Sequence, residues 1–268
     1  MKSFCRLMRH LVTSIMVLSS TIPTSLTAET DHSKPAGSCF ITVGWEPWEP
    51  YMYLTPGTEV SGLDIEILEA LAQEAGCILN YKQANWRSLL VMIQNGEVDV
   101  LPGASISESR KSFALFSESY REEHFAFYVN FEDLDEFPIT IQSLVEGGKK
   151  IGVTSGYMYG DELTYYQDSE SYAEHFVETA IGEANIYSLL QHSIDVFVED
   201  PFVATYNLQR KGLSDQIKQL PIDIHTGDIY LMFSKQTVEQ EVVDRFNKAL
   251  AKIKKNTVYK RITERYQL

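Results

Sequence analysis

The stretch GLDIEILEALAQEAGCILNY, residues 62–81, decides the fold. Its apolar residues recur at helical spacing from Ile65 to Ala72, which predicts an amphipathic helix. Gly76 follows that pattern directly and is typical of a helix C-terminus, and residues 78–81 then have the apolar character of a strand. The stretch therefore predicts a helix that leads almost at once into a strand, as in an α/β protein.

The same alternation continues on both sides of this stretch. The predicted elements are a strand at 40–44, the helix after Gly62, a strand at 78–81, a loop carrying Trp86, a helix closed by Asn95-Gly96, and a strand at 98–101 that runs into a turn at Pro102-Gly103. This β-α-β-α-β series predicts a doubly wound, mainly parallel sheet, and the ligand crevice of such a sheet lies at the carboxyl ends of its strands. Trp48, Trp86 and Gly103 all follow such strand ends.

A second α/β series begins near Lys150. Its predicted strands lie at 151–154, 176–180 and 195–198, and its predicted helices at 158–167, 183–191 and after Asp200-Pro201. Extended segments at 125–129 and 229–233 are interpreted as crossings between two lobes, with helices at 242–253 and 257–266 returning to the first. The predicted organisation is a signal peptide at 1–28, lobe 1 at 38–122 and 230–268, and lobe 2 at 125–226.

The N-terminus has the layout of a secretory signal peptide. A basic start is followed by an apolar run at 11–22 and by small residues up to Ala28. The run is too short and too rich in Ser and Thr for a membrane span, which needs about 20 apolar residues. An uncleaved amphipathic anchor is the alternative. We expect export to the periplasm with cleavage near Ala28, and no later stretch is apolar enough to span a bilayer.

Cleavage would change the charge and the cysteine count. It removes three basic residues and no acidic ones, which takes the formal charge from −14 to −17. Such acidity argues against nucleic acid or an anionic membrane as a partner, because both need basic patches. Cleavage also removes Cys5 and leaves Cys39 and Cys77, each directly before an apolar run. If those runs are adjacent parallel strands, the two cysteines either form a disulfide, as an oxidising compartment favours, or stay buried thiols.

One arginine is a candidate anion ligand. The stretch PGASISESRKSF, residues 102–113, begins at a strand end and enters a helix near Ser107. Arg110 in the first turn can grip a carboxylate with two parallel hydrogen bonds, Gly103 lets the backbone approach, and Ser105 offers its hydroxyl and N–H. The alternative is an ordinary N-cap at Ser107 and a surface ion pair at Arg110.

The second lobe offers a candidate for an ammonium group. Asp200 ends a strand and could accept from a ligand ammonium, although Asp before Pro is also a good helix N-cap. Trp48 and Trp86 could form aromatic walls, or simply belong to the core. No metal-binding spacing, CxxC pair, phosphate loop or GxSxG motif is present in the sequence, so no cofactor, metal or catalytic residue is predicted.

In order and combination, six motifs make the chain resemble the bacterial periplasmic solute-binding proteins of family 3, the polar amino acid receptors of ABC transporters. They are G-x-D-I-E-I-x-x-A-L-A at 62–72, Trp86 followed by N-G-E-V-D at 95–99, G-x-S-I-S-x-x-R at 103–110, F-S-x-x-Y at 116–120, I-G-V-x-x-G at 151–156 and D-V-F-V-E-D-P at 195–201. The resemblance implies a type II fold: two α/β lobes joined by two hinge strands that close over a ligand.

The resemblance also implies residue roles. Arg110, Ser105 and Gly103 would hold a ligand α-carboxylate and Asp200 the α-amino group, with Trp48 and Trp86 as walls. The chain departs from the family pattern at two positions. Many receptors carry a small hydroxyl residue where this chain has Tyr157, whose large ring would reshape the pocket floor. Some receptors carry an acid where this chain has Trp45.

The function implied is that of a monomeric, non-enzymatic receptor. It would bind an amino acid or a similar small molecule and deliver it to a membrane permease. The alternatives are a solute-binding partner of a sensory receptor and a dehydratase-like enzyme on the same fold, for which Glu46 or Glu199 would be the acid or base.

Overall fold

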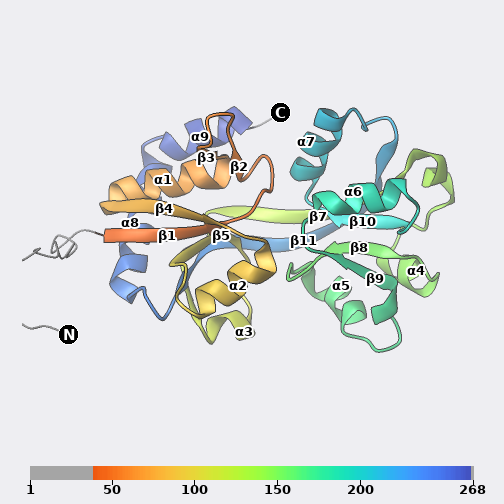
Figure 1. Ribbon diagram of the computed structural model, residues 1–268, viewed down its shortest axis with the longest axis horizontal. Coiled ribbons are helices and arrows are strands. Elements are labelled where there is room, and N and C mark those ends of the chain that lie inside the picture. Colours follow the sequence, from red (N-terminus) through yellow and green to blue (C-terminus); the bar gives the residue numbers. More distant parts are fainter. Residues whose placement is uncertain (1–38, 267–268) are drawn as a thin grey trace, which may run out of the picture. The chain divides into compact units, whose positions relative to one another are not determined.

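The computed structural model describes residues 39–266, and the predicted signal peptide lies outside them. Nine strands form one continuous sheet in the order β4-β1-β5-β11-β7-β10-β8-β9, with β6 pairing β11. The two halves of this sheet, with helices on both faces of each, are the first and second lobes (Figure 1).

The first lobe contains four strands of the sheet, a two-stranded hairpin and five helices. These are β1 (Cys39–Trp45), β2 (Tyr53–Leu54), β3 (Val60–Ser61), α1 (Leu63–Ala75), β4 (Cys77–Gln83), α2 (Trp86–Gln94), β5 (Val100–Ala104), α3 (Glu108–Lys111), β6 (Ala114–Phe116), α8 (Gln240–Lys255) and α9 (Val258–Tyr266). The two C-terminal helices, α8 and α9, pack against the core of this lobe.

The second lobe is built from three strands and four α-helices, with two short 3-10 turns. They are η1 (Phe131–Glu136), α4 (Ile141–Glu146), β8 (Ile151–Thr154), α5 (Gly160–Gln167), η2 (Ala173–His175), β9 (Phe176–Thr179), α6 (Glu183–Leu190), β10 (Val196–Glu199) and α7 (Pro201–Lys211). Strand β8 pairs in parallel with both β9 and β10.

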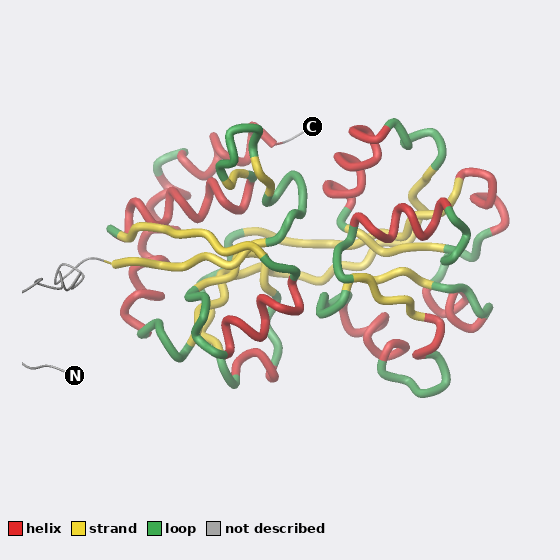
Figure 2. Tube along the Cα trace, in the orientation of Figure 1, coloured by secondary structure: helices red, strands yellow, loops and turns green. Residues whose placement is uncertain are grey.

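Two long antiparallel strands, β7 (Arg121–Asn130) and β11 (Ile217–Ser234), run between the lobes (Figure 2). Near its C-terminal end β11 pairs with β5 and β6 of the first lobe, and along the rest of its length it pairs with β7. Because the chain crosses only in these extended segments, they are the two hinge strands expected of the fold.

Helix α1 shows why the sequence of residues 62–81 predicted the fold. Its apolar residues at positions 65, 67, 68, 71 and 72 are all buried, and most of them belong to the core formed with α8 and β1. Gly76 ends the helix with φ 67°, a left-handed conformation that glycine adopts without steric cost. The next residue, Cys77, begins β4.

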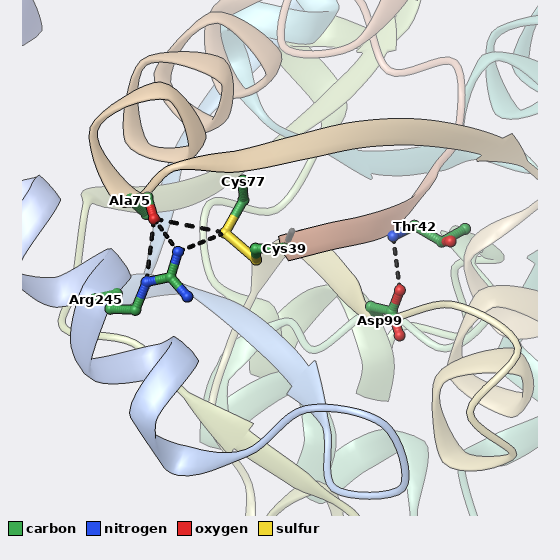
Figure 3. Close-up of a disulfide and its surroundings, with 6 residues drawn as sticks. All are labelled: Cys39, Thr42, Ala75, Cys77, Asp99 and Arg245. Atoms are coloured by element: carbon green, nitrogen blue, oxygen red, sulfur yellow. Dashed lines mark hydrogen bonds between the residues drawn. A yellow bond between two sulfur atoms is a disulfide. The ribbon is translucent and has the colours of Figure 1, made fainter. Parts of the chain in front are cut away.

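The two cysteines of the first lobe form a disulfide. Strands β1 and β4 pair in parallel with Cys39 directly opposite Cys77, and the two Cα atoms are 4.5 Å apart (Figure 3). Arg245 of α8 donates to the carbonyl of Ala75 beside the bridge. Of the two alternatives left open by the sequence, the structure contains the bridge.

Several predicted boundaries were wrong near the cleft. Trp86 is the first residue of α2 and not part of a loop, because the Asn85 side chain caps the helix by accepting from the Ser88 N–H at 2.9 Å. The strand predicted to stop before Gly103 continues to Ala104, where it pairs with Tyr230 of β11. Strands β2, β3 and β6, helix α4 and the first part of β11 were not predicted.

Candidate functional site

A small cavity of about 20 Å³ lies between the two lobes, roughly the free space of one water molecule. Its lining comes from β5 and β7, from the loops that follow β1, β5 and β8, and from helices α2 and α3. The residues are Glu46, Trp48, Met52, Trp86, Pro102, Gly103, Ser105, Arg110, Glu123, Phe125, Tyr157 and Met158. The crevice is therefore at the carboxyl ends of the parallel strands, as the doubly wound topology predicted.

Direct hydrogen bonds join the lobes around this cavity. The Trp86 indole N–H donates to the carbonyl of Gly156 at 3.1 Å, and the Tyr157 hydroxyl donates to Glu46 Oε1 at 2.7 Å. The Tyr157 ring stands edge-on to the rings of both Trp48 and Trp86, with centroids 6.0 and 6.2 Å away. Tyr157 thus fills much of the space between the two indoles, which explains the small cavity.

Arg110 places an unpaired cation at the cavity. The Ser107 hydroxyl caps α3 by accepting from the Arg110 N–H, and the Arg110 side chain donates to the carbonyls of Ser105 at 2.9 Å and Gly156 at 3.1 Å. Within residues 39–266 it forms no ion pair with a carboxylate. Burial lowers the pKa of its guanidinium to about 10, partly offset by Glu123, so it stays charged at neutral pH.

A buried ion pair supports the aromatic wall. Arg121 of β7 donates from Nε and Nη2 to the two oxygens of Asp64, at 2.9 and 3.1 Å. Its guanidinium lies 4.2 Å from the ring centroid of Tyr51 and 5.5 Å from that of Trp48, which stack on one another. The Asp64–Arg121 pair therefore supports the Trp48 loop through the two stacked rings. The charge of Arg121 is balanced by Asp64.

Two carboxyl groups face the cavity. Glu46 accepts from the Tyr157 hydroxyl and from the Trp86 backbone N–H at 2.9 Å, and burial raises its pKa to about 7. Glu123 on β7 is 6% exposed and lies 3.4 Å from Arg121 Nη1. Burial also raises the pKa of Glu123 to about 7, against the lowering effect of Arg121.

Two further acids lie behind the cavity in the second lobe. Glu199 Oε1 accepts from the Trp48 indole N–H at 3.1 Å and from the Asp200 N–H at 3.0 Å, and burial raises its pKa to about 8. Asp200 Oδ1 accepts from the N–H groups of Phe202 and Val203, and Oδ2 accepts from the Tyr51 hydroxyl at 3.2 Å. Burial raises the pKa of Asp200 as well.

These buried acids give the protein a pH-dependent stability. A carboxyl whose pKa is higher in the folded state stabilises the fold below its unfolded pKa, and this contribution is lost as the pH rises through the folded value. For Glu123, the step from pH 5.5 to 8.5 corresponds to a loss of about 2 kcal/mol. We expect wild type to lose more unfolding free energy over this step than Glu123→Gln, measured by urea denaturation. Equal losses in the two proteins would contradict the assignment.

A family model decides what kind of protein carries this cleft. The model described as bacterial extracellular solute-binding proteins, family 3, matches residues 41–268. The chain belongs to this family. The family resemblance inferred from the sequence motifs is thereby confirmed, and so is the prediction that the protein is not an enzyme, because the family consists of solute-binding proteins.

Individual relatives of this solute-binding protein share about a quarter of its sequence. The arginine-binding periplasmic protein of Mannheimia haemolytica is 25% identical over 82% of this chain and 87% of its own. The L-cystine-binding protein TcyA of Bacillus subtilis is 25% identical over 84% of this chain and 80% of its own. A solved ancestral arginine-binding protein has a TM-score of 0.72 at 22% identity, covering 85% of this chain and 97% of its own. That likeness confirms the two-lobed periplasmic-binding-protein fold of type II.

Six of the seven ligand residues predicted for the solute-binding protein line the cavity. They are Trp48, Trp86, Gly103, Ser105, Arg110 and Tyr157. Asp200 does not line it, and it caps α7, the role that the sequence left as its alternative. Contact of any of these residues with a ligand stays a prediction.

Sequence reasoning missed Glu123, which the structure brings to the cavity. Its signal was the two-residue period of a strand in REEHFAFYV, residues 121–129: Glu123 lies two residues before Phe125 and therefore on the same strand face. Among the described residues no group of three or more His, Cys, Asp or Glu side chains could hold a metal ion, and none of the helices is both long and apolar enough to span a membrane.

Proposed function

We propose that this solute-binding protein is a periplasmic receptor for an amino acid or an amino acid-like solute, and that it delivers its ligand as a monomer to an ABC-type permease. The observation that carries the proposal is the buried, unpaired guanidinium of Arg110 in the interlobe cavity, beside Ser105 and Gly103 and facing two carboxyl groups. A zwitterion needs such an arrangement, with a cation for its carboxylate and an acid for its ammonium.

Supporting this proposal, relatives that match most of the chain are named as amino acid-binding proteins, among them an arginine-binding periplasmic protein. The basic and apolar N-terminal segment supports export, and the disulfide fits an oxidising compartment. The direct bonds from Arg110 and Trp86 to the Gly156 carbonyl describe closed lobes, so we propose that the lobes open to admit ligand.

Replacing Arg110 is the direct test. We expect a panel of free amino acids to raise the melting temperature of the mature protein, with a stabilisation of about 2.7 kcal/mol at a hundredfold excess over Kd. Arg110→Ala should weaken binding at least about 30-fold, because a buried charge-assisted pair contributes about 2–5 kcal/mol. Titration calorimetry measures both affinities.

Lys111→Ala is the matched control, since Lys111 is the next residue of α3 and its side chain is 52% exposed, paired with Glu108. It should leave affinity unchanged. Arg110→Lys, which keeps the charge but loses the paired geometry, should fall between wild type and Arg110→Ala. Wild-type affinity in a folded Arg110→Ala protein would contradict carboxylate recognition, and no binding by any amino acid would contradict the proposed function.

A further inference from the structure

The charges that line the cavity do not match a simple zwitterion. Two carboxyl groups, Glu46 and Glu123, and one guanidinium, Arg110, face the space. An α-amino acid with a neutral side chain would pair its carboxylate with Arg110 and its ammonium with one carboxyl. The second carboxyl would then receive no cation from the ligand, and its ionised form is costly without one in a site closed to water.

The neighbouring cation Arg121 is shared between two carboxyl groups. It makes two shorter hydrogen bonds, of 2.9 and 3.1 Å, to Asp64 and a longer ion pair, of 3.4 Å, with Glu123, so its single charge does not offset both. The acids behind the cavity, Glu199 and Asp200, receive only N–H and O–H donors and add to the negative potential. The surplus of acid thus persists beyond the lining itself.

Glu46 already carries a donor that a ligand could replace. The hydroxyl of Tyr157 donates to Glu46 Oε1 at 2.7 Å while the Tyr157 ring lies between the two indoles. A phenol is a neutral donor. A ligand cation at this position would make a stronger, charge-assisted bond to Glu46 and would lie between aromatic walls that favour a cation.

We infer that the site selects amino acids with a cationic side chain, and that Glu46 is the residue that distinguishes them from neutral amino acids of the same shape. The inference rests on the proposed function and names its substrate class. Such a ligand carries two cationic groups and one carboxylate, and it balances the two carboxyl groups and the one guanidinium of the lining. Its side-chain cation replaces the Tyr157 hydroxyl at Glu46, and its α-ammonium pairs with Glu123.

The buried carboxyl groups predict a second measurable effect of ligand binding, the release of protons. Burial raises the pKa of both Glu46 and Glu123 to about 7, so near neutral pH the free protein binds protons at these carboxyls. Around Glu123, Arg121 and Arg110 favour the charged form, whereas Asp64 and Asp200 oppose it; around Glu46, Tyr157 and the Trp86 N–H favour the charged form and Glu199 opposes it. A bound cation favours the ionised form of a carboxyl, so binding of the ligand releases protons at neutral pH.

The experiment compares matched ligands by titration calorimetry of the mature protein. Lysine is paired with norleucine and arginine with citrulline, because each partner keeps the shape but lacks the side-chain charge. We expect the cationic member of at least one pair to bind tenfold or more tightly, as expected for one charge-assisted bond. Titration in two buffers with different ionisation enthalpies should show proton release with that member and less with its neutral partner.

Three variants locate the effect. Glu46→Gln should weaken the cationic ligand about tenfold or more while changing the neutral ligand about twofold or less. Glu123→Gln should weaken both ligands by a similar factor, because both carry the α-ammonium that pairs with Glu123. Glu122→Gln is the control, since Glu122 is the neighbouring residue of β7, is exposed and faces away from the cavity. It should change neither affinity.

Each outcome bears on the inference. Neutral partners that bind as tightly as the cationic members would overturn it while leaving the proposed function intact. A preference for the cationic members that survives Glu46→Gln would overturn the assignment to Glu46. If no amino acid binds at all, the proposed function fails and the inference fails with it.

Discussion

Replacing Asp64 with alanine should lower the free energy of unfolding by about 3–5 kcal/mol, because the buried charge of Arg121 loses its two short hydrogen bonds and keeps only the longer contact with Glu123. Both side chains are shielded from water, with 0% of Asp64 and 7% of Arg121 exposed, and two hydrogen bonds of 2.9 and 3.1 Å join them. The remaining acid near Arg121 is Glu123, whose Oε1 is 3.4 Å away. Chemical denaturation of the mature protein, without added ligand, measures the loss.

Two controls separate the buried charge from the loss of packing. The double variant Asp64→Leu/Arg121→Met removes both charges and keeps apolar volume, so it should recover most of the stability lost by Asp64→Ala. Glu97→Ala removes the partner of Lys82 in an exposed pair, with 40% and 49% of the side chains accessible, and should cost under about 1 kcal/mol. A cost of Asp64→Ala no larger than that of Glu97→Ala would contradict the assigned role.

This ion pair illustrates what the sequence alone could not provide. Asp64 and Arg121 are 57 residues apart, and in the sequence Asp64 is an ordinary acid in the first turn of a helix. Local patterns predicted α1 because its apolar spacing and its terminal glycine are properties of adjacent residues. Pairing between β7 and α1 depends on how the chain returns, and no local pattern specifies that.

The hinge strand β11 also could not be predicted in full from local sequence. Only residues 229–233 of β11 were predicted as extended, whereas the strand begins at Ile217. Its first part contains Pro221 and Gly227, which are unfavourable in strands, and the register with β7 shifts twice, between Gln219 and Asp223 and again between His225 and Gly227. Pairing with β7 overrides the weak local preference of this segment.

The residues of the candidate site also differ in whether local sequence could predict them. Arg110, Ser105 and Gly103 were predictable because they belong to one short motif whose residues reach the cavity together. Glu123 is separated from that motif by β6 and is brought back by β7. Asp200 was predicted from its position at a strand end. Whether an N-capping residue also faces a cavity depends on the rotation of the helix that it caps, here α7. The second carboxylate oxygen of Asp200 accepts a hydrogen bond from the Tyr51 hydroxyl.

Removing the disulfide should cost about 4 kcal/mol, because the bridge closes a loop across a sequence separation of 38 and restricts the unfolded chain. Alanine is the appropriate replacement, since Cys77 is 8% exposed and lies in the apolar core of the first lobe, where a serine hydroxyl would be unfavourable. We expect Cys39→Ala/Cys77→Ala to melt about 10 °C lower than wild type, measured by calorimetry on the mature protein.

Reduction of the wild-type protein is the matched control, because it opens the loop and keeps both cysteine side chains. If the bridge acts through the unfolded chain, the reduced wild type and the double alanine variant should lose similar unfolding free energy, and reductant should not affect the variant. A reduced protein as stable as the oxidised one, beside a destabilised alanine variant, would show that packing of the sulfur atoms, rather than the covalent link, stabilises this edge of the sheet. Because the bridge joins β1 and β4 at the end remote from the cleft, ligand affinity should be the same in all three proteins at temperatures where they are folded.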